Sequence, residues 1–178
     1  PGWWWFDCIY PYLPQNNLEE GILWCPSRCI DDERLKLNVF HGNYGVNGSI
    51  CLNAYEGRSK REFMGIPLQS TEILKPSETL LAADSGYCII NWWHVTLSPP
   101  GRLLKDAEDG NYAPGLGINA EKFVPPGHET DAFNGRHPNK TLNIAFADGH
   151  AARRPAEMFI VEKSANGYTN LSPLWRSR

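Results

Sequence analysis

The chain has 178 residues, of which 42% are hydrophobic and 21% charged, so it holds enough apolar material for a core and too little charge for an obligately disordered protein. This length predicts one domain spanning residues 1–178. A net charge of −3 does not indicate a nucleic-acid partner, because such proteins usually concentrate Lys and Arg on one face. The sequence contains no run of 18 apolar residues, so it predicts no membrane span. The start at Pro1 indicates a fragment or a processed product.

The first thirteen residues are rich in aromatic side chains. They read PGWWWFDCIYPYL, and Pro11, followed by Pro14 just after them, favours a partly buried extended segment over a helix. The simpler interpretation of the tryptophans at residues 3–5 is core packing. The alternative is a platform on which sugar rings stack.

Two buried strands are expected in the first half of the chain. Residues 38–53 (NVFHGNYGVNGSICLN) alternate apolar residues with Gly and Asn, which is typical of strands and turns. A turn at residues 75–78 leads into a buried strand over residues 79–83 that ends at Asp84. A carboxylate at the end of a strand is a natural ligand and is as often a turn cap.

The middle of the chain predicts loops rather than regular structure. Residues 98–130 are rich in Pro, Gly, Asp and Asn, with one short helical candidate at residues 102–107. We therefore expect a long surface excursion over residues 89–130.

A β-hairpin is the clearest local prediction. Residues 141–147 (TLNIAFA) alternate apolar and polar positions with a period of two, which predicts a strand. Asp148 and Gly149 follow at once, and this dipeptide is among the strongest signals for a two-residue hairpin turn.

The return strand and a short helix complete the predicted hairpin region. We expect the return strand at residues 150–154 and a closing helix at residues 155–163. With a two-residue turn, Ala147 would face His150, which would place the accessible His150 side chain on the same face as Asn143.

Five cysteines are consistent with an oxidising compartment, although the odd count leaves one unpaired unless its partner lies outside this sequence. Cys25 and Cys29 could close a small ring or be two independent thiols. No second pair of ligands follows at zinc-site spacing, so this spacing favours a disulfide or inert thiols over a metal. The disulfide candidates are Cys8, Cys25, Cys29, Cys51 and Cys88.

Six separated segments, in order along the chain, together carry a family resemblance: residues 24–27 (WCPS), 44–47 (YGVN), 75–84 (KPSETLLAAD), Arg136-His137, Asn143 and residues 146–150 (FADGH). They resemble the prepilin-type proteins whose C-terminal region is named for a His, nine residues and Asp-Gly, and which are abundant in planctomycetes and their relatives. Ten residues separate His137 from Asp148 here, so the sequence departs from that pattern in loop length.

The resemblance implies the soluble head of a pilin-like or pseudopilin-like protein of the cell envelope, on its periplasmic or extracellular face. Such a head has a structural or assembly role in a filament or a type II secretion complex. The implied fold is α+β, with a small antiparallel sheet, long irregular loops and short helices. A preceding N-terminal helix, absent from this sequence, would anchor the protein in the membrane and pack against other pilin-like subunits.

Two carboxylates and two imidazoles are candidate ligands for a divalent metal ion, namely Asp84, His137, Asp148 and His150. Spacing alone does not bring Asp84 to the hairpin, whereas the order of segments in the family makes the cluster plausible. The simpler interpretation is that Asp148 caps its own turn and His137 hydrogen-bonds to the neighbouring loop.

Two other functions stay open beside the structural role. One is an extracellular enzyme that cleaves polysaccharide as a lyase, with His137 or His150 as general base and the other His, or a Tyr, as general acid. No nucleophile elbow, phosphate loop or dinucleotide fingerprint occurs, so the sequence does not favour an enzyme. The other is a polysaccharide-binding protein, for which the candidate stacking residues are Trp3, Trp4, Trp5, Trp92 and Trp93.

Overall fold

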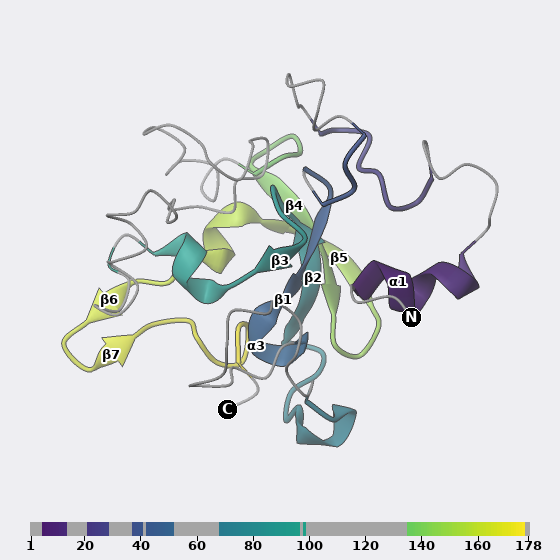
Figure 1. The fold of residues 1–178 in the computed structure, drawn as a ribbon. Helices are drawn as coiled ribbons and strands as arrows, with labels where there is room; N and C mark the ends of the chain where they lie inside the picture. The colour runs from purple at the N-terminus through teal and green to yellow at the C-terminus, as the bar shows by residue number, and fades with distance from the viewer. Residues whose placement is uncertain are drawn as a thin grey trace, which may run out of the picture.

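A five-stranded sheet forms the centre of the protein (Figure 1). The structure is a computed structural model, and it describes residues 5–13, 21–28, 37–40, 42–51, 68–96, 98 and 135–176. The strand order is β3-β1-β2-β4-β5, and every neighbouring pair is antiparallel except β1 and β3. The strands are β1 (Tyr44–Asn47), β2 (Leu80–Asp84), β3 (Ile89–Ile90), β4 (Thr141–Phe146) and β5 (Ala151–Pro155).

The helices are all short. They are α1 (Trp5–Ile9), η1 (Tyr10–Tyr12), α3 (Gly48–Cys51), η2 (Ser70–Glu72), η3 (Trp92–Val95) and η5 (Ala156–Phe159). A two-stranded ribbon, β6 (Lys163–Ser164) and β7 (Gly167–Tyr168), stands apart from the main sheet. The predicted α+β class with a small, mostly antiparallel sheet is confirmed. None of the helices in the described ranges is long and apolar enough to cross a membrane.

The main core lies on one face of the sheet. Leu142, Ile144 and Phe146 alternate along β4 and are buried, as the period of two predicts. Trp175 packs edge-on against Phe159, with ring centroids 5.8 Å apart, and its Nε1 donates to the carbonyl of that residue at 3.1 Å. The C-terminal segment therefore closes the core over the sheet.

The predicted turn and strand before Asp84 are confirmed. The N–H of Glu78 donates to the carbonyl of Lys75 at 3.0 Å, which closes the turn, and β2 follows it. In the predicted strand and turn region at residues 38–53, β1 packs tightly. A Cβ on Gly45 would lie 2.5 Å from the carbonyl oxygen of Tyr87, so only glycine fits between β1 and the backbone at Tyr87.

The hairpin between β4 and β5 has a three-residue loop, and the predicted two-residue turn is wrong. Ala145 pairs with Ala151, and the N–H of Phe146 donates to the carbonyl of His150 at 2.9 Å. Gly149 takes the left-handed conformation (φ 91°) that such loops require. His150 consequently lies beside Phe146, not on the Asn143 face, and its exposed ring stacks on Phe146 with centroids 4.4 Å apart.

Two helix predictions are also corrected. Residues 5–12 form α1 and η1 rather than an extended segment, because Pro11 occupies the first turn of η1, where its missing N–H is not needed. The predicted closing helix at residues 155–163 is only the single turn η5. The chain then extends, and the N–H of Val161 donates to the carbonyl of Val95 at 3.0 Å, which stops the helix.

The predicted surface excursion starts too early. Ile89 and Ile90 form β3, and Trp92 and Val95 are core residues, so residues 89–95 belong to the folded body. Ile89 and Ile90 lie in the sheet because they are apolar and the pairing of β3 with β1 buries their side chains. From residue 99 to its predicted end at residue 130, the excursion lies outside the described residues, and so does the helical candidate at residues 102–107.

Replacing Leu142 with alanine should destabilise the protein by about 2–5 kcal/mol, because the side chain is fully buried in the core. Arg154→Ala on the neighbouring strand is the control, and it should stay within about 0.5 kcal/mol because Arg154 is exposed. Urea unfolding of both variants measures the difference. Equal midpoints for the two variants would contradict this position of the core.

Candidate functional site

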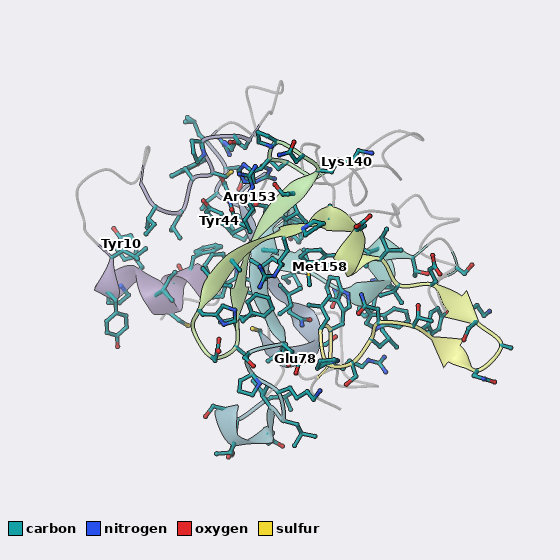
Figure 2. The ribbon with its side chains drawn as sticks, turned by 180° about the vertical axis from the view of Figure 1, so that it is seen from behind. Tyr10, Tyr44, Glu78, Lys140, Arg153 and Met158 are labelled. Atoms are coloured by element: carbon teal, nitrogen blue, oxygen red, sulfur yellow. The ribbon has the colours of Figure 1, made fainter. Side chains whose placement is uncertain are left out.

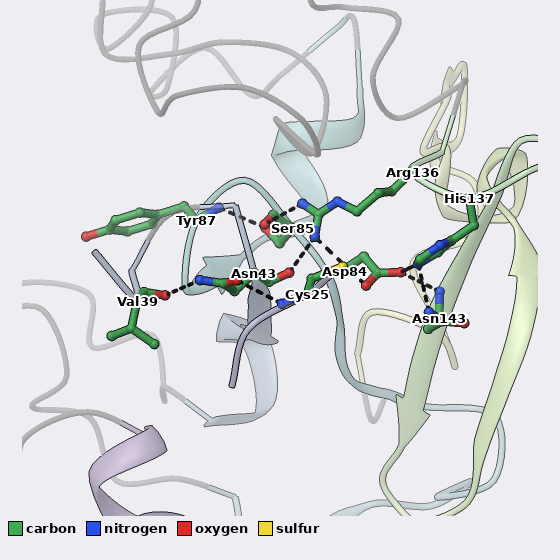
Figure 3. A network of polar contacts seen from close by, with 9 residues as sticks. All are labelled: Cys25, Val39, Asn43, Asp84, Ser85, Tyr87, Arg136, His137 and Asn143. Atoms are coloured by element: carbon green, nitrogen blue, oxygen red, sulfur yellow. Dashed lines mark hydrogen bonds and ion pairs between the residues drawn. The ribbon is translucent and has the colours of Figure 1, made fainter. Parts of the chain in front are cut away.

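A buried ion-pair cluster lies where β2 ends (Figure 3). Asp84 is the last residue of β2, and its side chain has no exposed surface. Its Oδ1 lies 4.0 Å from Nη1 of Arg136, and its Oδ2 lies 3.0 Å from Nε2 of His137. Buried charges are costly to desolvate, so these groups are tolerated because they face one another.

Arg136 ties two separate segments together. Its Nη1 donates to the carbonyl of Asn43 at 2.8 Å, and its Nη2 donates to the carbonyl of Ser85 at 3.0 Å. These carbonyls belong to the loop before β1 and the turn after β2, and the N–H of Ser85 donates to the same Asn43 carbonyl at 3.1 Å. The planar guanidinium suits this geometry, since it presents several donors in one rigid fork.

His137 is fixed at the base of the hairpin. Its backbone forms an antiparallel bridge with Thr141, with hydrogen bonds of 3.0 and 3.3 Å. Its Nε2 also lies 2.8 Å from Nδ2 of Asn143, an amide nitrogen that can only donate, so the imidazole nitrogen accepts in this contact. The backbone N–H of Asn143 donates to Oδ2 of Asp84 at 2.7 Å. The predicted hydrogen-bonding role of His137 is thus directed at Asp84 and Asn143.

Cys25 joins this cluster from a third direction. Its backbone N–H donates to Oδ1 of Asn43 at 3.0 Å. Its Sγ lies within 4.8 Å of a carboxylate oxygen of Asp84 and of a ring nitrogen of His137. The sequence favoured a disulfide or an inert thiol over a metal ligand for Cys25 and did not link it to Asp84, although residues 24–27 and Asp84 both belong to the segments that carry the family resemblance.

Tyr44 borders the same cluster. The pKa of its phenol is raised to about 12, mainly by burial and also by the neighbouring Cys25 and Asp84, while Arg136 acts in the opposite direction. The phenol therefore stays protonated at neutral pH and can act as a hydrogen-bond donor. Burial, with the nearby positive charge of Arg136, also lowers the pKa of Arg28.

The other two predicted metal ligands lie elsewhere. Asp148 and His150 form their own pair at the hairpin tip, with Oδ1 and Nδ1 2.6 Å apart. The N–H of Asp148 donates to the carbonyl of Pro76 at 3.2 Å, beside the turn that contains Glu78. In Figure 2, Glu78 and Lys140, which precedes β4, lie at opposite ends of the sheet. The predicted four-residue metal site is therefore wrong, because β4 separates its two halves.

The hairpin-tip carboxylate is a turn cap. The backbone N–H of His150 donates to Oδ1 of Asp148 at 3.1 Å, and this bond is the main reason why the pKa of Asp148 lies below its usual range. The His150 side chain lowers the pKa further. The simpler interpretation of Asp148 made from its sequence, that of a cap, matches this geometry.

The candidate sugar-stacking tryptophans that the structure describes are Trp5, Trp92 and Trp93. Trp92 is only 3% exposed and belongs to the core, so its ring offers no free face. Trp5 is half-buried, and its Nε1 donates to the carbonyl of Cys88 at 3.0 Å. Trp93 is half-buried beside Trp92 with ring centroids 6.0 Å apart. The remaining candidates, Trp3 and Trp4, lie outside the described residues.

Three of the predicted disulfide candidates are free thiols. Cys8 is exposed, Cys25 is buried and Cys51 is half-buried, so the small ring between Cys25 and Cys29 is not formed. Burial raises the pKa of Cys51 to about 11, which makes it an inert thiol at neutral pH. Cys88 is buried in a small cluster with Ile89, and Cys29 lies outside the described residues.

No family model, curated protein or solved structure matches the chain. The functional inference therefore depends on the geometry of the polar cluster and of the sheet. The Asp84 side chain is fully buried and that of His137 is 14% exposed, so the cluster presents little surface to a substrate. General acid–base catalysis needs the reacting group within hydrogen-bonding distance of the imidazole, which this burial does not favour.

Arg136→Met should destabilise the protein by about 3–5 kcal/mol, because it removes the guanidinium and leaves the buried Asp84 carboxylate without that cation. Arg153→Met is a matched control. Arg153 is exposed, with bonds to Thr141 and Pro138, and its loss should cost about 0–1 kcal/mol. Urea unfolding measures both variants, and similar losses in the two would show that Arg136 is not the structural centre of the cluster.

Asp148 should titrate below its ordinary pKa of 3.8. Because the folded-state pKa is depressed, its ionised form stabilises the fold above the ordinary value, and this contribution disappears as the pH falls through the folded pKa. His150→Ala should return the pKa only part of the way, since the backbone N–H of residue 150 remains. A carboxyl-carbon NMR titration measures both. A complete return to 3.8 in His150→Ala would disprove the dominant role of the backbone hydrogen bond.

Proposed function

We propose that the chain is the soluble head of a pilin-like or pseudopilin-like envelope protein with a structural or assembly role. The observation that carries this proposal is an apolar pocket on the sheet face opposite the main core. The pocket has a volume of about 280 Å³ and is lined by residues of α1 and of the sheet. Figure 1 shows α1 beside the sheet. Its lining is almost entirely apolar and includes Trp5, Ile9, Leu23, Ala82, Ala145 and Ala151.

The small side chains of this face suit a packed helix. Ala82, Ala145 and Ala151 come from three adjacent strands, and their short side chains allow another element to approach the sheet closely. A sheet face that carries apolar residues usually buries them against a second layer, and α1 covers only part of it with one and a half turns. We propose that a long hydrophobic helix of a pilin-like subunit occupies the pocket.

The polar cluster supports the same role. Asp84 and Arg136 are buried and bond to backbone groups of neighbouring segments, as expected of a scaffold. A lyase-type enzyme that uses both imidazoles would need His137 and His150 within one cleft. These residues lie at opposite ends of β4, so the geometry favours a structural subunit over the enzyme.

A photo-crosslinker at Ala151 tests this function in the complete protein made by its own cells. Ala151 is exposed and lines the pocket, so ultraviolet light should link it to a hydrophobic helix of a pilin-like subunit in the envelope fraction. Gel shift followed by mass spectrometry identifies the linked segment.

The matched control is the same crosslinker at Lys163, which is exposed on the separate β6–β7 ribbon. This position should give no such product. Recovery of the protein away from the envelope, or equal crosslinking from both positions, would refute the proposed packing.

A further inference from the structure

Three different metal-binding atoms converge beside the ion pair. Cys25 Sγ, a carboxylate oxygen of Asp84 and a ring nitrogen of His137 all lie within 4.8 Å of one another. They come from the loop at residues 21–28, the end of β2 and the segment before β4, so only the folded chain brings them together. In Figure 3 the Asp84 carboxylate lies between Arg136 and His137, with Cys25 beside it.

We propose that Cys25, Asp84 and His137 bind one zinc ion, which fastens the loop at residues 21–28 to the end of the sheet. Sulfur, nitrogen and carboxylate oxygen are the three donor types of protein zinc sites, and a water molecule can complete four-coordination. The thiolate selects against Mg²⁺ and Ca²⁺, which prefer oxygen donors. This ion goes beyond the pilin-like role, and either can hold without the other.

An unsatisfied oxygen supports the proposal independently. Oδ1 of Asp84 is buried and has no hydrogen-bond partner among the described residues. Its closest cationic atom, Nη1 of Arg136, lies at 4.0 Å, which is beyond hydrogen-bonding distance. A buried polar atom left without a partner costs about 1–3 kcal/mol, and an ion that the carboxylate binds through both of its oxygens would recover this energy.

The ligands are held in place by backbone hydrogen bonds. Asn43 accepts from the N–H of Cys25, Asn143 donates to Asp84, and Thr141 bridges to the backbone of His137. The 3.0 Å between His137 Nε2 and Asp84 Oδ2 is close to the ~3.3 Å expected for two ligands on one tetrahedral zinc with bonds near 2.05 Å. This pair of ligand atoms therefore needs little rearrangement to bind an ion, and the Sγ of Cys25 lies within 4.8 Å of both.

Cobalt titration of the purified chain, freed of metal by chelator, tests the proposal. Co²⁺ replaces zinc in such sites, and a thiolate ligand adds a sulfur-to-cobalt charge-transfer band in the near ultraviolet. The wild-type protein should bind one equivalent with this band, and Zn²⁺ should displace the cobalt. Cys25→Ser should lose the band and weaken binding at least about 10- to 100-fold, the usual cost of removing even an outer partner of a metal site.

Cys8→Ser is the matched control, because Cys8 is an exposed free thiol, and it should keep both the band and the affinity. Absence of the band in the wild type, or its persistence in Cys25→Ser, would overturn the proposal. If far-ultraviolet circular dichroism shows that Cys25→Ser does not fold, His137→Gln decides, since unchanged cobalt affinity in that variant would also overturn it.

Discussion

The fold depends on one buried cation and the groups that it faces. Arg136 is 8% exposed, yet its guanidinium bonds to the carbonyls of Asn43 and Ser85 and faces the carboxylate of Asp84. A hydrophobic residue of equal volume could fill the same space, but it could not satisfy these carbonyls. The cation therefore specifies which segments meet at this end of the sheet, rather than simply adding stability.

This constraint extends along the hairpin to its far end. The residue after Arg136 is His137, which forms a backbone bridge with Thr141, the first residue of β4. The buried side chains of β4 belong to the main core. At the tip, the N–H of Ala147 donates to the carbonyl of Thr79 at 2.9 Å, which ties the loop to the start of β2. Asn47 adds a third tie, since its Nδ2 donates to the carbonyl of Leu80 at 2.9 Å and to that of the C-terminal Trp175 at 3.2 Å.

Local patterns were enough to predict part of this arrangement. The period of two in β4 and the turn before β2 depend on neighbouring residues alone, and both are correct. The face of His150 was missed because Asp-Gly serves two- and three-residue loops alike, and the ladder beyond the loop decides between them. The convergence of Cys25 with Asp84 was missed because it is tertiary, and no spacing along the chain encodes it.

The interval between His137 and Asp148 shows why proximity in a motif can mislead. The family resemblance places the two residues in one motif and suggests one cluster, yet the six residues of β4 stand between them. At about 3.4 Å per residue, that strand separates its ends by about 17 Å, so no single ion can reach both. The interval between them is thus the length of a hairpin, with the proposed metal ligands at its base and a turn cap at its tip. Each end is explained by its own contacts, and the base alone has the buried donors that a metal ion requires.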